Sequence, residues 1–368
     1  MILLNILAFS MAFLSGQNVV LPTSLIQYFT PSLSEPVNGT FLVAFQTVQT
    51  TNTLSTTTGL PIKNITIQTS TLPPNTSETL PGGIWTPPVE VVSHGTVPVQ
   101  NPAVSVLPSS TLALIYQVGE TPQAVYGAMM TSTTAGATWS AEALLPAGIL
   151  GVTPGQPVVN PNYVSMPGAT GVTRLIYGSW VEAGDPVNPD QATACWVQYA
   201  PADLSSWTKA GPFAIPARPF GAVMPVFFQG LTTSEVHFLC SDKALVVGGS
   251  GNIWQSTSFD FGATWSTLTS TGLPNPNTSI STVQIAPGKV LLFYNPSSTS
   301  PTPLVAAYSA DSGATWTNVA TIDSSTVANS PSAMIGSDGQ IHVVYSVSLD
   351  PAGTHVGIRH VVYRYVYP

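Results

Sequence analysis

An eight-residue motif that occurs twice near the C-terminal end limits what this chain can fold into. Residues 258–265 and 309–316 both read S-x-D-x-G-A-T-W, and residues 132–139 repeat the pattern with Thr134 in place of the Asp. Oxygens of Ser and Asp accept hydrogen bonds from loop amides, and Gly tolerates a positive φ angle. The Trp offers a large apolar surface that packs a turn against a sheet. Three copies at long intervals therefore predict a β-hairpin that is built the same way several times.

The tryptophans of these motifs belong to a longer series. Trp85, Trp139, Trp207, Trp265 and Trp316 follow one another at intervals of 54, 68, 58 and 51 residues. Internal periods of about 50 residues are typical of propeller blades. We therefore expect a ring of similar sheets, with these tryptophans near the periphery.

A second repeat predicts the number of units. Six times, a small anchor dipeptide is followed by an apolar run, a turn and another apolar run that ends in an aromatic or similar residue. The anchors begin at Thr30, Asn101, Gln156, Met224, Ser281 and Ser330, and the second runs are residues 41–45, 112–116, 174–177, 236–240, 290–294 and 341–345. Short β-branched and aromatic runs without helical periodicity are typical of an all-β chain. We predict a six-bladed β-propeller whose inner strands start at the anchors.

The C-terminal run, residues 360–367, is predicted to pair with N-terminal strands. This pairing closes the ring, and closure protects the edge strands.

The first 16 residues are apolar and end in small residues, which is typical of a secretory signal peptide. We predict cleavage near Gly16-Gln17 and one propeller domain over residues 17–368. The stretch lacks a positively charged start, and the alternative, a membrane anchor, needs a longer apolar segment. No other segment is long and apolar enough to cross a bilayer. The sequence therefore predicts a secreted, extracellular protein without a membrane span in its mature chain.

Four Asn-X-Ser/Thr sequons favour a glycoprotein, at Asn38, Asn64, Asn75 and Asn277. Residues 47–79 are rich in Ser and Thr, which favours either O-glycosylation or a Thr-rich pair of outer strands. The two cysteines, Cys195 and Cys240, either form a disulfide in an oxidising compartment or remain buried free thiols. The sequence leaves both alternatives open.

Charged residues are unusually rare. They make up 7% of the chain, against about 25% in typical soluble domains. A net charge of −8 with only eight Lys and Arg disfavours nucleic acid as a partner. Weak electrostatic repulsion suits sugar-coated or self-associating extracellular material, such as a homo-oligomer, filament or coat. The five His show no metal-ligand spacing, and no nucleotide-binding motif occurs, so we expect neither metal nor cofactor.

The eight-residue motif resembles the Asp-box of the sialidase (BNR-repeat) superfamily, where it closes an outer β-hairpin and serves the scaffold. Residues 145–151, 273–278 and 338–345 also look like recurrent segments of the sialidase-like group, in the same order. The resemblance spans nearly the whole chain and implies the same six-bladed propeller. The residues that match the Asp-box in its two complete copies are Ser258, Asp260, Gly262, Trp265, Ser309, Asp311, Gly313 and Trp316.

The resemblance implies an active site that has lost its catalytic set. Sialidases of the family attack with a Tyr activated by a Glu, hold the substrate carboxylate with three Arg, and use an Asp as general acid/base. Ser330 stands at the family's Tyr position, and Ser241 and Pro301 stand at two Arg positions. Of four Arg in the chain, Arg359 and Arg364 lie on the predicted closing strand. Arg218 is the one expected near the mouth of the ring.

Two functional hypotheses follow. The first is a binding or structural module without activity, whose partners are glycans or extracellular matrix and coat components. Its predicted binding residues at the ring mouth are Tyr177, Trp180, Trp196, Arg218 and Tyr294. The alternative is an exo-glycosidase, a sialidase-like glycoside hydrolase acting on a terminal neutral sugar with Glu182 and Asp185. Two carboxylates about 5–10 Å apart in the central pocket would distinguish it. The sequence favours the first hypothesis and leaves enzymatic activity open.

Overall fold

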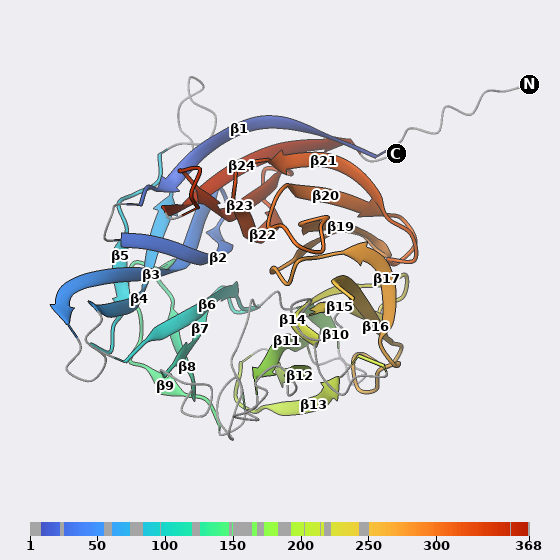
Figure 1. Ribbon diagram of the computed structural model, residues 1–368. Coiled ribbons are helices and arrows are strands. Elements are labelled where there is room, and N and C mark those ends of the chain that lie inside the picture. The colour runs from blue at the N-terminus through green and yellow to red at the C-terminus, as the bar shows by residue number, and fades with distance from the viewer. Residues whose placement is uncertain are drawn as a thin grey trace, which may run out of the picture.

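The described part of the chain is built from β-strands that form a ring of sheets. The computed structural model describes residues 9–22, 26–54, 61–73, 84–95, 97–119, 126–146, 149, 164–167, 173–182, 193–201, 203–213, 215–216, 222–242, 250–353 and 355–366. Within these ranges there is no α-helix, and every described sheet has four antiparallel strands. Figure 1 shows the sheets arranged around a common centre, each running from an inner to an outer strand. The predicted all-β propeller is therefore confirmed.

The described strands form six four-stranded sheets, and in each sheet they follow one another from the inner to the outer position. They are β2 (Ile26–Val37), β3 (Thr40–Leu54), β4 (Pro61–Leu72) and β5 (Val89–Val92); β6 (Val99–Val106), β7 (Leu112–Val118), β8 (Tyr126–Ser132) and β9 (Ala143–Leu144); β10 (Val164–Pro167), β11 (Thr173–Glu182), β12 (Thr193–Pro201) and β13 (Thr208–Phe213); β14 (Ala222–Gln229), β15 (Val236–Asp242), β16 (Asn252–Ser258) and β17 (Thr269–Pro274); β18 (Ser281–Ala286), β19 (Lys289–Tyr294), β20 (Leu304–Ser309) and β21 (Thr317–Asp323); and β22 (Ala328–Ile335), β23 (Ile341–Ser348), β24 (Val356–Val366) and β1 (Ser10–Val20).

The two repeats of the sequence fall where they were expected. All six second runs lie in the second strands of their sheets, and five of the six anchors lie in inner strands. The sixth anchor, Gln156-Pro157, lies outside the described residues. Each tryptophan of the series lies one to four positions before the outermost strand of its sheet, as Trp265 does before β17 and Trp316 before β21.

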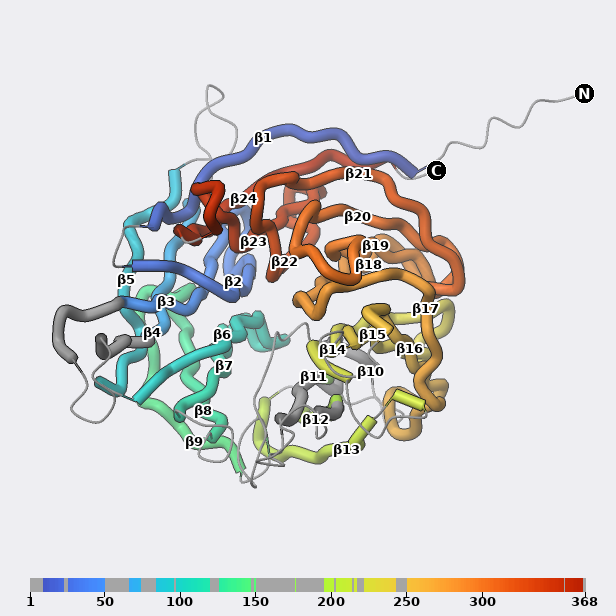
Figure 2. Tube along the Cα trace, viewed as in Figure 1, coloured from blue at the N-terminus to red at the C-terminus, as the bar shows by residue number. Residues whose placement is uncertain are grey.

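The ring is closed by the two ends of the chain. β1 pairs antiparallel with β24, from Ser10 opposite Val366 to Val20 opposite Ile358. Figure 2 shows the N-terminal strand running along the C-terminal one. The predicted pairing of the C-terminal run with an N-terminal strand is confirmed.

This closure uses residues that the sequence assigned to a signal peptide. Residues 10–16 lie within β1, and the predicted cleavage near Gly16-Gln17 falls inside this strand. Just before it, Phe9 is buried and stacks on Tyr308, with ring centroids 4.3 Å apart. The folded ring therefore extends at least seven residues further toward the N-terminus than the predicted domain boundary. The signal peptide stays a prediction, and the structure shows that residues 10–16 of this apolar run pair with β24.

The complete Asp-boxes form nearly identical turns. Asp260 Oδ1 accepts hydrogen bonds from Thr264 N at 2.8 Å and Ser258 Oγ at 2.7 Å. The corresponding distances at Asp311 are both 2.8 Å, to Thr315 N and Ser309 Oγ. These hydrogen bonds outweigh the effect of burial and hold the pKa of both carboxyls below the usual value. The Asp-box thus connects the third and outermost strands, and its role is structural.

The cysteines come together between two neighbouring sheets. Cys195 on β12 and Cys240 on β15 are free thiols, fully buried in one apolar cluster. Burial and a hydrogen bond with Cys240 raise the pKa of the Cys195 thiol well above its usual value. The packing of β12 and β15 therefore brings the two thiols into one cluster, and the structure has them as free thiols. No helix long and apolar enough to cross a membrane occurs in the described ranges.

Candidate functional site

The centre of the ring is bordered by the six inner strands, four of which share an irregular backbone. Thr30, Asn101, Met224 and Ser330 have positive φ angles of 47°, 53°, 57° and 52°, and each precedes a proline. The pairing of each inner strand with its neighbour shifts register at this point. Left-handed residues other than Gly are uncommon and collect at functional sites. The anchors are therefore repeated bulges around the centre, where the sequence placed the active site of the family.

The side chains at these bulges are uncharged. Asn101 Nδ2 donates to Gln117 Oε1 at 2.7 Å. Met224 accepts a weak hydrogen bond from Ser279 Oγ at 3.4 Å. The Thr30 hydroxyl is buried and has no hydrogen-bond partner among the described residues. This set offers neutral polar groups and a thioether to a ligand.

Acidic and basic residues are almost excluded from the inner strands. Across β2, β6, β10, β14, β18 and β22 as described, the single acidic or basic residue is Glu35. Its carboxylate accepts hydrogen bonds from Gly39 N at 2.6 Å and Ser337 N at 2.7 Å, at the turns that follow two inner strands. Glu35 therefore ties two hairpin turns together. The inner strands bring no carboxylate pair and no Arg to the centre.

The three positions where the family has Tyr or Arg have neutral roles in this chain. Ser330 occupies the bulge of β22. Ser241 is fully buried and donates from its hydroxyl to Thr278 O at 3.0 Å. Pro301 accepts a backbone hydrogen bond from Ala328 N at 3.2 Å. None of them can bind a substrate carboxylate as a guanidinium does.

Several predicted site residues lie outside the described residues. Asp185 and Arg218 do so entirely. Glu182, Tyr177 and Trp180 have described backbones in β11, where Glu182 pairs with Thr193, but their side chains lie outside the described part. The predicted carboxylate pair stays a prediction.

The two predicted aromatic residues that are described do not lie at the mouth. Tyr294 is only 2% exposed, and its hydroxyl donates to Asn318 Oδ1 on the outermost strand β21, at 3.2 Å. Trp196 lies on the third strand of its sheet, with Lys209 Nζ of the outermost strand β13 above its ring at 3.9 Å. Neither placement supports sugar stacking at the mouth, and this role stays a prediction. The sequence shows two aromatic residues on predicted strands, but it does not show which face of the sheet each side chain points to.

Two of the four sequons have described asparagines. Asn38 is exposed in the turn between β2 and β3, an accessible position for a glycan. Asn277 is half-buried, with a φ angle of 66°, in the connection between β17 and β18. The Asn64 side chain and all of Asn75 lie outside the described residues.

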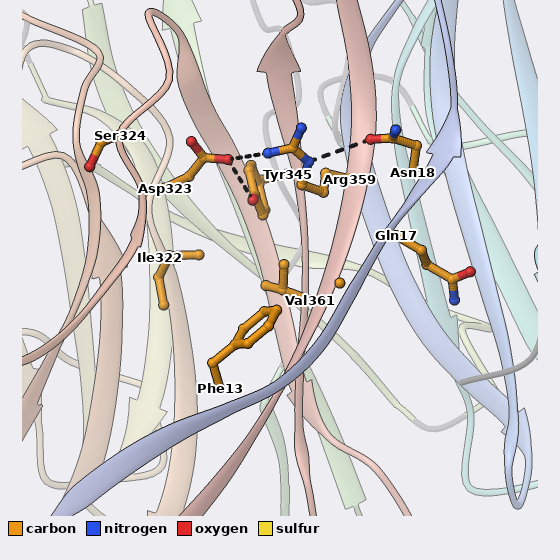
Figure 3. Close-up of a pocket in the computed structure, with 10 residues that line it drawn as sticks. Phe13, Gln17, Asn18, Ile322, Asp323, Ser324, Tyr345, Arg359 and Val361 are labelled. Carbon is orange, nitrogen blue, oxygen red and sulfur yellow. Dashed lines mark hydrogen bonds and ion pairs between the residues drawn. The ribbon is translucent and has the colours of Figure 1, made fainter. Parts of the chain in front are cut away.

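The sequence missed a cavity at the outer junction of the last two sheets (Figure 3). It has a volume of about 530 Å³ and is bordered by β1, β21, β23 and β24. Asp323 Oδ2 accepts hydrogen bonds from Tyr345 Oη and Arg359 Nη1, both at 2.8 Å. Arg359 Nε donates to Asn18 Oδ1 at 3.4 Å. The sequence placed Arg359 on the closing strand, but it had no signal for the partners that neighbouring strands contribute.

The ionisation of this cluster follows from its contacts. Burial raises the pKa of the Asp323 carboxyl, but hydrogen bonds from Ser325 and Tyr345 and the charge of Arg359 lower it more, so its pKa lies below the usual value. Burial and the nearby Asp323 charge raise the pKa of the Tyr345 hydroxyl, which therefore stays protonated. Asp323 and Arg359 form an ion pair without net charge. No group of three or more His, Cys, Asp or Glu that could hold a metal ion occurs among the residues described.

Solved structures with this architecture include sialidases. A protein of unknown function from Dyadobacter fermentans matches with a TM-score of 0.71 and 16% identity, over 96% of this chain and 99% of that chain. The NanB sialidase of Streptococcus pneumoniae matches with a TM-score of 0.67 and 13% identity, over 96% and 70%. The leech intramolecular trans-sialidase matches with a TM-score of 0.68 and 12% identity, over 96% and 70%. Identities this low show a shared fold.

No curated protein is significantly similar to this chain in sequence. The BNR repeat-like domain family, in contrast, matches residues 62–343, which is more than half of the chain. The motif, the ring of four-stranded sheets and this match agree, and the chain belongs to the BNR repeat-like domain family of sialidase-like propellers.

Proposed function

We propose that this protein is a secreted, sialidase-like propeller that binds glycan without hydrolysing sialosides. Each of the six sheets serves as one blade. The observation that carries the proposal is the nearly uncharged set of inner strands, in which Ser330 replaces the family's Tyr. The structural likeness supports the scaffold, and the residues of this chain support the loss of activity.

The chemistry of sialoside cleavage explains why this set matters. The substrate carries a carboxylate beside the reacting carbon, so an oxocarbenium-like transition state forms next to an existing negative charge. Guanidinium groups hold that carboxylate through charge-assisted, often bidentate hydrogen bonds. In the described residues, Arg359 is held by Asp323 at the outer side of the ring, and Arg364 is exposed on β24. Neither can serve a site bordered by the inner strands.

The proposal of secretion rests on the sequons and on the rarity of charge. Asn38 is exposed in a tight turn, so its side chain is accessible to the attachment of a sugar. The fold adds one condition, because residues 10–16 are part of β1. We therefore propose an export route that does not cleave the chain within β1.

Self-association is a second candidate role, favoured by the outer strands. In each described sheet the outermost strand, such as β17 or β21, has one edge that pairs with no further strand of that sheet. Such edges pair with other chains unless charges or attached sugars block them, and only 7% of residues are charged. Light scattering of the secreted protein with and without enzymatic removal of its sugars tests this role. A monodisperse monomer in both states would contradict it.

The test of the main proposal is an assay with a fluorogenic sialoside, run beside an active sialidase. We expect no release of sialic acid above the blank, and binding to immobilised glycans in the same preparation. Turnover that disappears in Glu182→Gln would overturn the proposal and support the glycosidase hypothesis. Glu35→Gln is the matched control, because Glu35 is held at hairpin turns.

A further inference from the structure

The cavity between the fifth and sixth sheets combines an exposed aromatic ring with a fixed set of polar groups. Its volume of about 530 Å³ lies within the usual range of small-ligand sites, about 300–1,000 Å³. Phe13 and Val361 lie on one side, and Asp323, Tyr345 and Arg359 lie on the other (Figure 3). Two surfaces of opposite character therefore face one space.

The polar side is preorganised. Asp323 is held by Tyr345 and Arg359, and Asn18 supports the guanidinium from β1. The Arg359 side chain is 31% exposed, and its hydrogen bonds to Asn18 and Asp323 engage Nε and Nη1. The exposed part of its planar guanidinium can thus donate further hydrogen bonds to a ligand.

The polar side also lacks net charge. Asp323 and Arg359 neutralise each other, and the remaining polar side chains of the cavity, Gln17, Asn18, Ser324 and Tyr345, are neutral. An anionic ligand would be opposed by the buried carboxylate, and a cationic one by the guanidinium. A neutral ligand that both donates and accepts hydrogen bonds fits best, and hydroxyl groups do both.

The apolar side presents a ring that is held in place. Phe13 is 59% exposed, and its ring meets Tyr363 edge-on, with centroids 5.6 Å apart and an interplanar angle of 73°. The register of β1 against β24 shifts between Phe13 and Ser15, and bulges of this kind re-aim side chains. A large aromatic ring exposed in this way is a surface for an apolar ligand face. The C–H face of a pyranose ring is such a face.

We propose that this cavity binds a neutral hexopyranose unit of a glycan, with the sugar face on Phe13 and its hydroxyls on Arg359 and Asn18. The site lies at the outer junction of two blades, apart from the centre of the ring. The inference rests on the glycan-binding function proposed above and assigns it to a particular place. It also gives the N-terminal strand a function, because Phe13 and Asn18 both belong to β1.

The experiment uses the full chain and three probes, methyl β-glucopyranoside, methyl β-galactopyranoside and methyl α-mannopyranoside. Saturation-transfer NMR detects binding, and calorimetry measures the affinity. We expect at least one probe to bind, and we expect Phe13→Ala to weaken it tenfold or more. Phe259→Ala is the matched control, since Phe259 is 70% exposed at the outer hairpin of another sheet.

A second variant distinguishes a loss of binding from a misfolding of β1 in Phe13→Ala. Ser324 is exposed at the rim of the cavity, so Ser324→Trp fills the space without disturbing the strands. It should abolish binding at an unchanged melting temperature. Binding that survives both Phe13→Ala and Ser324→Trp would overturn this site and leave the glycan-binding function standing. If none of the probes binds but immobilised sialosides do, the neutral-sugar assignment is wrong. If no glycan binds at all, the proposed function fails with it.

Discussion

The backbone amide of Leu33 donates a hydrogen bond to the hydroxyl of Ser332 at 3.0 Å, although the two residues are 299 positions apart. The contact joins the inner strands of the first and last sheets beside two of the left-handed bulges. Two further contacts repeat it, from Val104 N to Ser32 Oγ at 3.0 Å and from Ala333 N to Ser281 Oγ at 3.1 Å. Each of these amides belongs to an inner strand, three residues after a left-handed residue, and a serine of the neighbouring sheet accepts its hydrogen bond.

Ser332→Ala should therefore destabilise the ring. The substitution leaves the buried Leu33 amide without an acceptor, which costs about 1–3 kcal/mol. Chemical denaturation followed by tryptophan fluorescence measures the loss. Ser324→Ala is the control, because Ser324 is exposed and should change stability by less than about 0.5 kcal/mol. Equal effects of the two substitutions would show that the inter-sheet contact does not stabilise the ring.

The incomplete Asp-box, residues 132–139, allows a substitution that is expected to increase stability. Thr134 Oγ1 accepts the hydrogen bond from Thr138 N at 2.8 Å that Asp accepts in the complete copies. Thr134→Asp should preserve this contact and make the existing 2.8 Å hydrogen bond to the Thr138 hydroxyl charge-assisted, as at Asp260. We expect a small gain in stability for Thr134→Asp and a loss of about 1–2 kcal/mol for Asp260→Ala. Thermal unfolding of both variants measures the pair, and neither should change glycan affinity.

A buried pair of histidines should make the junction of the first and last sheets sensitive to acid. His342 Nδ1 and His360 Nε2 lie 3.1 Å apart, with Phe41 stacked on His342 and Trp85 edge-on to His360. Burial and the neighbouring His342 lower the pKa of His360 to about 3, although Asp338 opposes this shift. Unfolding restores the usual value of about 6.5, so the unfolded chain binds the additional proton.

The contribution of His360 to stability should consequently be constant above about pH 6.5 and should fall as the pH drops from 6.5 toward 3. At pH 5 the loss from His360 amounts to about 2 kcal/mol. Denaturation curves between pH 5 and 7 measure it, a range in which Asp338 remains ionised because its pKa lies below the usual value. His360→Gln should flatten this slope. A slope that is unchanged in His360→Gln would contradict the assignment.

The N-terminal strand should be required for a stable fold. Removal of residues 1–16 deletes Phe9 from the core and most of the partner of β24, so a long edge strand becomes exposed. We expect a lower melting temperature and aggregation on concentration. Mass spectrometry of the secreted protein supplies the natural N-terminus. A mature chain that begins at Gln17 and is fully stable would show that β1 is dispensable.

The repeated scaffold could be predicted from the sequence because its determinants are local. Ser258, Asp260 and Gly262 bond within one turn, and each apolar run encodes its strand through alternation and β-branched residues. The period between tryptophans then implies a ring, since each unit needs a neighbour to bury its faces. The neutral residue at the family's Tyr position, Ser330, could also be seen in the sequence.

The sites depended on contacts that no local pattern encodes. Trp196 and Tyr294 were expected at the mouth, but the direction of a side chain depends on which face of its strand meets which sheet. Asp323, Tyr345 and Arg359 meet because β21 belongs to one sheet and β23 and β24 to the next. The amino-acid sequence by itself determined the hairpin turns, the strand repeats and the neutral inner strands. Only the tertiary structure showed that residues 10–20 pair with β24, and that this strand borders a cavity with Asp323 and Arg359, because both depend on contacts between residues more than 300 positions apart.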